Sequence, residues 1–204
     1  MVMAADVKAF IRFCESTFGK KVMEKEAEYL YDELRSCEKI LDVGCGIGTF
    51  ERNLPTLNII GLDISEEMLD EARKRSGKTF VQGDATQLQF RDSTLDAVFT
   101  VATLEFLDDF RDAIKEMARV TKPDGKIVVM MLNPKSEYFR EEVKKPDDYF
   151  RRIKHSNLGE MREFLSRFYT ITVGNYCLGV RGKQVFDTDE ERYSSLYIVA
   201  GMRK

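Results

Sequence analysis

The sequence predicts an α/β fold built around an open, doubly wound and mainly parallel sheet. Five short apolar runs, typical of strands buried on both faces, alternate with segments whose apolar residues recur at helical spacing. Strands that alternate with helices predict right-handed βαβ units. The chain has 204 residues, of which 43% are hydrophobic, and this length suffices for one full-sized core. Because no repeat, low-complexity segment or linker is visible, a single domain is expected.

The expected elements can be justified in chain order. Residues 6–18 and 21–35 show the amphipathic spacing of two helices ahead of the first strand. Ser65 can cap a helix over 66–75, because its hydroxyl can accept a bond from the first helical turn. Apolar residues at helical spacing mark a further helix over 110–120, which ends before a Pro-Asp-Gly turn. The five apolar runs cover residues 39–43, 58–62, 79–82, 95–100 and 126–132.

The alternation of predicted strands and helices ends after the fifth strand. Residues 133–156 are polar, charged and aromatic without a clear period, and helical spacing returns over 158–168. Residues 168–173 and 193–200 read as two strands that close the sheet, which makes seven. Within the one domain we therefore distinguish four parts. They are an N-terminal helical cap (1–37), a core (38–132), a segment that is a candidate lid (133–156), and a closing helix with strands (157–204).

Composition excludes several classes of function. The net charge is −3, from 32 Lys and Arg against 35 Asp and Glu, and no extended basic run offers a footprint for nucleic acid. No apolar stretch approaches the ~20 residues that span a bilayer, and the N-terminus lacks the apolar core of a signal peptide, so a cytoplasmic protein is expected. The four cysteines form no CxxC pair and the chain has one histidine, so neither a metal site nor a disulfide framework is expected.

The stretch LDVGCGIGTF (41–50) places three glycines behind the first predicted strand. Gly44, Gly46 and Gly48 would let the chain turn tightly and bring backbone N–H groups against a ligand at the carboxyl end of that strand. Taken alone, the pattern is also compatible with a tight turn and no ligand. Cys45 could be read as a nucleophile, but no histidine or cationic neighbour is visible to activate it, so we interpret it as a small buried residue.

Acidic residues at the next strand ends favour a nucleotide-like ligand. The run IIGLD ends in Asp63, nineteen residues after Gly44, where a carboxylate can accept two ribose hydroxyls. Asp84 follows the third strand in VQGDAT, and Asp42 belongs to the first. Dinucleotide-binding folds use G-x-G-x-x-G, whereas the third glycine here comes one residue earlier. An NAD(P)-dependent oxidoreductase is therefore an alternative that this spacing disfavours.

Five stretches together resemble one known family. They are KILDVGCGIGTF, IIGLDIS, FVQGDATQLQF, LDAVFTVATLEFLDD and ARVTKPDGKIVVMML, and they cover roughly residues 38 to 132. In order and spacing the chain resembles the class I S-adenosylmethionine-dependent methyltransferases, in particular the small-molecule methylases. The resemblance implies a Rossmann-like seven-stranded sheet with an antiparallel C-terminal strand, S-adenosylmethionine as the cofactor and S-adenosylhomocysteine as the product. A non-catalytic protein that binds the same cofactor is a further alternative.

The resemblance also implies a set of residues that contact the cofactor. These are Asp42 and the backbone of Gly44, Cys45 and Gly46 at the methionine end, Asp63 at the ribose, Ile64 and Met68 at the adenine face, Asp84 with the backbone of Ala85 at the adenine edge, and the backbone of Thr100 at the amino group. Ile64 and Met68 can equally be read as ordinary core residues.

The acceptor side carries weaker signals. The strand end TVATLEF lacks the Asn/Asp-Pro-Pro-aromatic signature of methylases that act on exocyclic amines of nucleic acids, no Pro-Cys pair is present, and the paired-glutamate loop of arginine methylases is not evident. A small-molecule acceptor is therefore expected by elimination. Candidate acceptor-side residues are Glu105, Tyr138, Tyr149 and His155. Glu105 could act as a base, contact a substrate amine or cap the next helix. Neither the acceptor's identity nor an oligomeric state is predicted.

Overall fold

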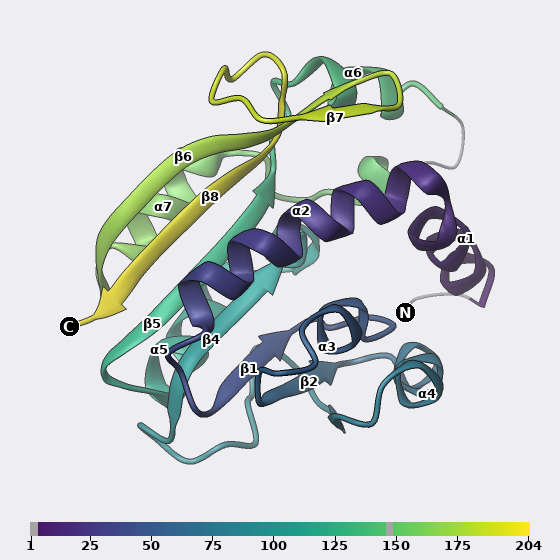
Figure 1. Cartoon of the computed structure of the whole chain (residues 1–204). Coiled ribbons are helices and arrows are strands. Elements are labelled where there is room, and N and C mark those ends of the chain that lie inside the picture. Colours follow the sequence, from purple (N-terminus) through teal and green to yellow (C-terminus); the bar gives the residue numbers. More distant parts are fainter. Residues whose placement is uncertain (1–3, 146–148) are drawn as a thin grey trace.

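A computed structural model describes residues 4–145 and 149–204. Within these ranges an eight-stranded sheet has the order β3-β2-β1-β4-β5-β8-β6-β7 (Figure 1). Strands β1 to β5 pair in parallel, β8 is antiparallel to β5 and β6, and β7 is antiparallel to β6. The strands are β1 (Ile40–Val43), β2 (Ile59–Asp63), β3 (Thr79–Gln82), β4 (Leu95–Val101), β5 (Thr121–Leu132), β6 (Tyr169–Arg181), β7 (Gln184–Phe186) and β8 (Ser194–Arg203).

Helices cover both faces of the sheet. On one face α2 and α3 join a core cluster with β1, β2, β4, β5 and β8, and on the other α5 and α7 pack in a second cluster. The helices are α1 (Ala4–Glu15), α2 (Thr17–Leu34), α3 (Thr49–Asn53), α4 (Glu66–Arg75), α5 (Phe110–Val120), α6 (Glu137–Glu142) and α7 (Leu158–Leu165), with short 3-10 helices η1 (Leu104–Phe106) and η2 (Tyr149–Arg152). The doubly wound, mainly parallel fold is confirmed.

Several predicted elements differ from the structure. The sheet has eight strands in the described residues rather than seven, because β7 adds a three-residue edge strand. Strand β6 runs eight residues beyond the predicted 168–173, since it keeps pairing with β8 as far as Gly179. Strand β5 begins at Thr121, directly after α5, so the predicted Pro-Asp-Gly turn lies inside it, with Asp124 at a φ of +59°.

The candidate lid is more regular than its sequence suggests. It contains α6 and η2, and Ser136 caps α6 by accepting the N–H of Phe139 at 3.1 Å. Residues 146–148 of this segment and residues 1–3 of the predicted cap lie outside the described residues. From here on, the lid segment means residues 133–145 and 149–156. Among the helices of residues 4–145 and 149–204, none combines the length and the apolar composition needed to cross a membrane.

Candidate cofactor and acceptor site

The glycine loop joins β1 to α3 in left-handed backbone conformations. Gly44, Gly46 and Gly48 have φ angles of +84°, +54° and +69°, which glycine adopts without the penalty that a Cβ would bring. The N–H groups of Gly44 and Cys45 both donate to the Leu62 carbonyl, at 2.7 and 3.0 Å. These bonds fold the loop over the end of β2. The predicted tight turn is therefore present, and it lies beside the second strand end.

Asp63 holds the loop from the neighbouring strand. Its Oδ2 accepts the N–H of Gly46 at 2.9 Å, and its Oδ1 accepts the N–H of Ser65 at 2.9 Å. Burial raises the pKa of Asp63, although the N–H groups of Ser65 and Gly46 lower it. Since a carboxylate oxygen can accept more than one bond, both oxygens keep capacity for hydroxyl donors. The structure thus brings Gly46 and Asp63 together, as the sequence predicted.

Asp42 lies next to this pair with an unmatched acceptor. Its side chain is 1% exposed, and Oδ2 has no hydrogen-bond partner among the described residues. Burial, and then the charges of Glu51 and Asp63, raise its pKa well above the usual value. A buried carboxylate in this state favours a cation or a donor nearby. On the adjacent strand, Thr100 is buried and its hydroxyl donates to the Val43 carbonyl at 2.8 Å, tying together the ends of β4 and β1.

The residues predicted for the adenine lie on the rim formed by the ends of β2 and β3. Ile64 is 63% exposed, which is unusual for a large apolar side chain and fits a surface that a ligand covers. Met68 is half-buried in α4, and Ala85 is buried. Asp84 is exposed, and its Oδ1 accepts both the N–H and the hydroxyl of Thr86 at 2.8 Å.

Glu105 is the buried acid of the acceptor side. It is 1% exposed in η1, its Oε1 accepts the N–H of Leu132 at 2.6 Å, and its Oε2 has no partner among the described residues. Burial raises the pKa of Glu105 to about 7, against the lowering effect of backbone N–H donors. The suggestion that Glu105 caps the following helix is wrong, because Asp109 caps α5. A carboxyl group near neutrality with one free oxygen is suited to take up a proton.

Aromatic rings connect the N-terminal helices to the lid segment and to η1. The hydroxyl of Tyr149 donates to the Ala102 carbonyl at 3.3 Å, so this side chain reaches the end of β4. Rings that follow one another in this network have centroids 4.4–6.3 Å apart. In order they are Phe13, Phe18, Tyr138, Phe150, Tyr149 and Phe106. Two acceptor-side candidates, Tyr138 and Tyr149, therefore belong to one aromatic network.

His155 packs against another aromatic side chain, and Cys45 is a buried thiol. The His155 ring stands edge-on to Phe110 at 5.0 Å, and its Nε2 lies 3.2 Å from the Asp108 carbonyl, so the side chain is directed at η1–α5 packing. Cys45 is buried, and burial with the nearby acids raises the pKa of its thiol, which disfavours the nucleophilic thiolate. All four cysteines are free. The residues that the structure describes contain no cluster of metal-ligating side chains.

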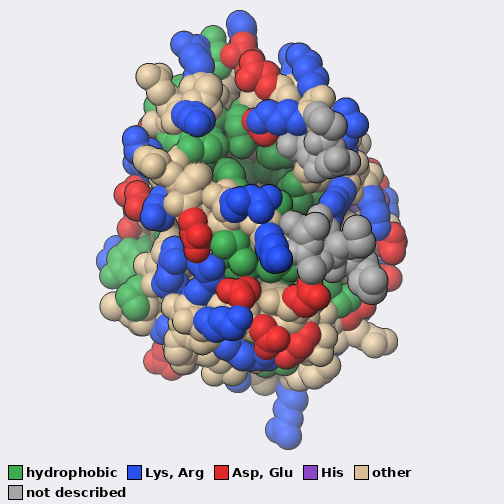
Figure 2. Space-filling view, turned by 90° about the vertical axis from the view of Figure 1, so that its right-hand side faces the viewer, with side chains coloured by type: hydrophobic (Ala, Val, Ile, Leu, Met, Phe, Trp, Pro, Cys, Tyr) green, Lys and Arg blue, Asp and Glu red, His purple; other side chains and the backbone are tan. Residues whose placement is uncertain are grey.

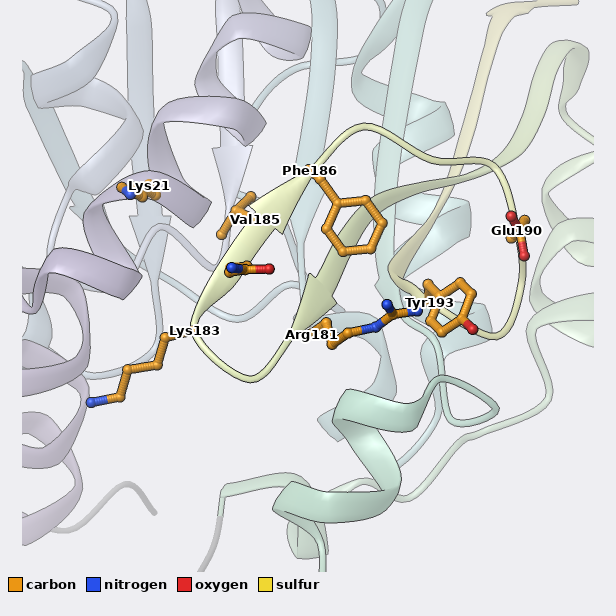
Figure 3. Close-up of a pocket in the computed structure, with 8 residues that line it drawn as sticks. Lys21, Arg181, Lys183, Val185, Phe186, Glu190 and Tyr193 are labelled. Atoms are coloured by element: carbon orange, nitrogen blue, oxygen red, sulfur yellow. The ribbon is translucent and has the colours of Figure 1, made fainter.

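The molecular surface is hollowed on the side of α1 and α4. Figure 2 shows this face, with hydrophobic side chains in the hollow and basic and acidic side chains around it. A separate pocket of about 520 Å³ lies between α2 and the β6–β7 hairpin. Figure 3 shows residues that line this pocket, among them Lys183, and Arg181 beside Tyr193, with 4.4 Å between the guanidinium carbon and the ring centroid. None of the predicted site residues lines this pocket between α2 and the β6–β7 hairpin.

The structure adds site neighbours that the sequence analysis missed. Phe10 of α1 approaches the loop, since a Cβ on Gly46 would lie 3.4 Å from its ring. A Cβ on Gly44 would lie 2.3 Å from the Thr103 hydroxyl oxygen. Glu51 of α3 is 1% exposed, and neither of its carboxylate oxygens has a partner in the described chain. The signal available for Glu51 was an acid one turn after the glycines, on a helix too short for a periodic pattern.

Comparisons with known proteins agree with this arrangement. The family model of the methyltransferase domain matches residues 41–129. A demethylmenaquinone methyltransferase of Renibacterium salmoninarum is 40% identical over 95 residues, which cover 45% of this chain and 40% of the relative. The chain spans about half or less of the length of the curated relatives it matches.

Two solved structures share the fold over nearly the whole chain. One, from Thermotoga maritima, is described as an S-adenosylmethionine-dependent methyltransferase, possible histamine N-methyltransferase. It has a TM-score of 0.81 and 22% identity, with 97% of this chain and 96% of that one covered. The other is magnesium protoporphyrin IX methyltransferase from Synechocystis with bound S-adenosylhomocysteine, with a TM-score of 0.72, 16% identity and coverage of 98% and 95%. Residues 41–129 therefore resemble the methyltransferase-domain family, and the whole chain has the fold of S-adenosylmethionine-dependent methyltransferases.

Proposed function

We propose that this protein transfers the methyl group of S-adenosylmethionine to a small-molecule acceptor. The observation that carries the proposal is the contact of 2.9 Å between the Gly46 N–H and the Asp63 carboxylate at the carboxyl ends of β1 and β2, beside the Asp42 Oδ2, which has no partner in residues 4–145 and 149–204. This set fits the cofactor, because carboxylates accept ribose hydroxyls and attract an ammonium group, while the glycines leave room for a ligand at the backbone.

Each predicted residue would then have one task. When bound, S-adenosylmethionine supplies an activated methyl group on a sulfonium, which is a good leaving group. The protein's part is to bind, orient and exclude water. Asp63 would accept hydrogen bonds from the ribose hydroxyls. At the methionine end, Asp42 and the Gly44–Gly46 backbone would hold the ligand, and the Thr100 backbone would face its amino group. At the adenine, Ile64 and Met68 would face the ring, and Asp84 with the Ala85 backbone would bind its edge.

Glu105 is the candidate base. A base is required only where the acceptor loses a proton near the transition state. Glu105 lies after β4 and bonds the end of β5, which is the same edge of the sheet as the glycine loop. Its free Oε2 could receive that proton, and a pKa of about 7 lets the group accept it near neutral pH and release it afterwards.

A small-molecule acceptor and a cytoplasmic location are parts of the same proposal. The names of the relatives, a demethylmenaquinone and a magnesium protoporphyrin IX methyltransferase, support a small organic acceptor. The aromatic network beside Glu105 is suited to enclose such a molecule. Four free cysteines support a reducing compartment.

The proposal is tested by calorimetry with S-adenosylhomocysteine, followed by a transfer assay over a panel of amines, phenols, quinols and carboxylic acids. Glu105→Gln should bind S-adenosylhomocysteine within about twofold of the parent and lower transfer to the best acceptor by about 10²-fold or more. The rise in the parent's rate as the pH increases through about 7 should vanish in this variant. Glu141→Gln, an exposed charge change in α6, is the matched control and should leave both measurements unchanged.

Other results would contradict the proposal. Binding of S-adenosylhomocysteine without transfer to any acceptor would favour a non-catalytic cofactor-binding protein. Tight NADH binding without S-adenosylhomocysteine binding would favour the oxidoreductase alternative. A Glu105→Gln variant with the parent's rate and pH profile would remove Glu105 as the base while leaving the transferase in place.

A further inference from the structure

Glu51 places a third acid beneath the glycine loop. It lies in α3, one turn after the loop, and its carboxylate is buried without a hydrogen-bond partner in the described residues. An unpaired buried carboxylate destabilises a fold, so a residue of this kind calls for a compensating role or a neutral form. Burial raises the pKa of Glu51 to about 7, with the charge of Asp63 adding to the effect and Lys78 opposing it.

The space for Glu51 is made by a glycine in the neighbouring strand. A Cβ on Gly61 of β2 would lie 2.6 Å from the Glu51 Oε1 and 2.9 Å from the Cys45 sulfur. Gly61 is also paired with Asp42 across β1 and β2, and Asp63 follows it by two residues on the same strand. The carboxylates of β1, β2 and α3 are therefore gathered around the strand ends that carry the loop.

No cation neutralises this group in the described residues. The opposing charge that lowers the pKa of Glu51 is Lys78, whose ammonium donates to the carbonyls of Pro55 and Leu57 at 2.7 and 2.6 Å. The charged and titratable groups that act on Glu51 and its neighbours are thus Asp42 from β1, Asp63 from β2, Cys45 from the loop and Lys78 ahead of β3. When their carboxyl groups are ionised, three acids against one engaged lysine make the electrostatic potential of the site negative.

We propose that Glu51 makes the site prefer the cationic sulfonium cofactor over its neutral product. This inference rests on the proposed function. S-adenosylmethionine carries a sulfonium, an ammonium and a carboxylate, for a net charge of +1, whereas the thioether S-adenosylhomocysteine has a net charge of zero. An additional buried negative charge stabilises the first ligand and leaves the second almost unaffected, so Glu51 favours binding of fresh cofactor and release of the spent one.

The preference follows the charge of Glu51 and hence the pH. At pH 6 the carboxyl group is largely neutral and contributes little to the preference, and at pH 8 it is largely ionised and contributes most of its effect. By linkage, binding of the cationic cofactor near pH 7 favours ionisation and releases a fraction of a proton to the buffer. Binding of the neutral product should release less.

Titration calorimetry with S-adenosylmethionine and S-adenosylhomocysteine at pH 6 and pH 8 tests this inference. In the parent protein the ratio of the two Kd values should favour the sulfonium more strongly at pH 8, by about three- to tenfold. Glu51→Gln should lose most of this pH-dependent part, the remainder belonging to Glu105 and Asp42, whose pKa values are also raised, and should bind S-adenosylhomocysteine nearly as before. Glu67→Gln, which removes an exposed charge in the first turn of α4, is the matched control and should behave like the parent.

A measurement on the parent protein keeps the inference testable where Glu51→Gln does not fold. Titrations at pH 7 in buffers of different ionisation enthalpy count the protons released, and the sulfonium should release more than the thioether. Equal release by both ligands, or an unchanged Kd ratio in a folded Glu51→Gln variant, would overturn the inference. Absence of binding by both ligands in the parent would instead refute the proposed function.

Discussion

Replacement of Asp63 tests the candidate cofactor site most directly. In Asp63→Ala the ribose would lose its charged acceptor, and hydrogen bonds to charged groups contribute about 1.5–3 kcal/mol. We therefore expect S-adenosylhomocysteine to bind about 10- to 150-fold more weakly. The pKa of Asp63 is raised by burial, so part of its effect on binding is offset by the cost of holding this charge, and we expect a value in the lower half of the range.

The same substitution affects the fold, because Asp63 also holds the loop. Its two oxygens accept the N–H groups of Gly46 and Ser65, each at 2.9 Å, and both donors would lose their partner. We expect a loss of ~1–3 kcal/mol in the free energy of unfolding, or roughly 2–8 °C in Tm. Asp63→Asn keeps one acceptor oxygen and turns an amide NH2 toward the other donor, so it should fall between the parent and the alanine variant in both measurements.

Calorimetry and thermal unfolding followed by circular dichroism measure these two effects separately. Asp70→Ala removes an exposed acid from α4, where it is paired with Arg73, and should change neither result appreciably. A folded Asp63→Ala variant with a Kd within twofold of the parent would refute the ribose assignment.

Three further predictions address the loop, the buried acids and the lid segment. Gly46→Val should abolish cofactor binding. Gly182 has a similar φ of +61° and open space around it, so Gly182→Val should carry the same backbone strain of ~1–2 kcal/mol as Gly46→Val but leave binding unchanged. Equal binding in both variants would show that the glycines serve only the turn. Burial raises the pKa of Glu26 to about 8, so this carboxyl group ionises in the unfolded chain above pH 4.5 but in the folded protein only near pH 8, and the free energy of unfolding falls over that range. Glu26→Gln should therefore raise Tm by about 4–8 °C at pH 8 and change it little at pH 4. A gain in Tm that is the same at both pH values would contradict this explanation. Hydrogen exchange should show that S-adenosylhomocysteine protects the lid segment together with α1 and α2; protection confined to the glycine loop would place the acceptor pocket elsewhere.

The cofactor half of the site could be predicted because its residues stand at strand ends. Parallel strands end at a common edge, so the spacing from Gly44 to Asp63 already brings the loop and the acid together without any knowledge of side-chain packing. Glu51 could not be predicted in this way. Its position depends on Gly61 leaving space in a neighbouring strand, and nothing local in the sequence around residue 51 carries that information.

The missed elements share a physical reason. Helix α6 has six residues and no buried side chain, so it shows no apolar stripe that periodicity could detect. Strand β7 lies at the sheet edge, where it pairs with β6 alone. Its three residues are too few to show an alternation of apolar and polar side chains. On the acceptor side, Glu105 was recognised as a candidate, but its bond to the Leu132 N–H joins two strand ends and could only come from the structure.

The position of β8 has a consequence for how the protein is synthesised. Among the described strands β8 comes last in sequence order, yet it lies between β5 and β6 and pairs with both. A growing chain that has emerged through β7 therefore holds two sheet pieces that cannot join, each with an unpaired edge and apolar residues ready to associate with other chains. We expect the ribosome-bound intermediate to depend on chaperones until β8 is released, and expression of the protein to fail if synthesis stops before that strand.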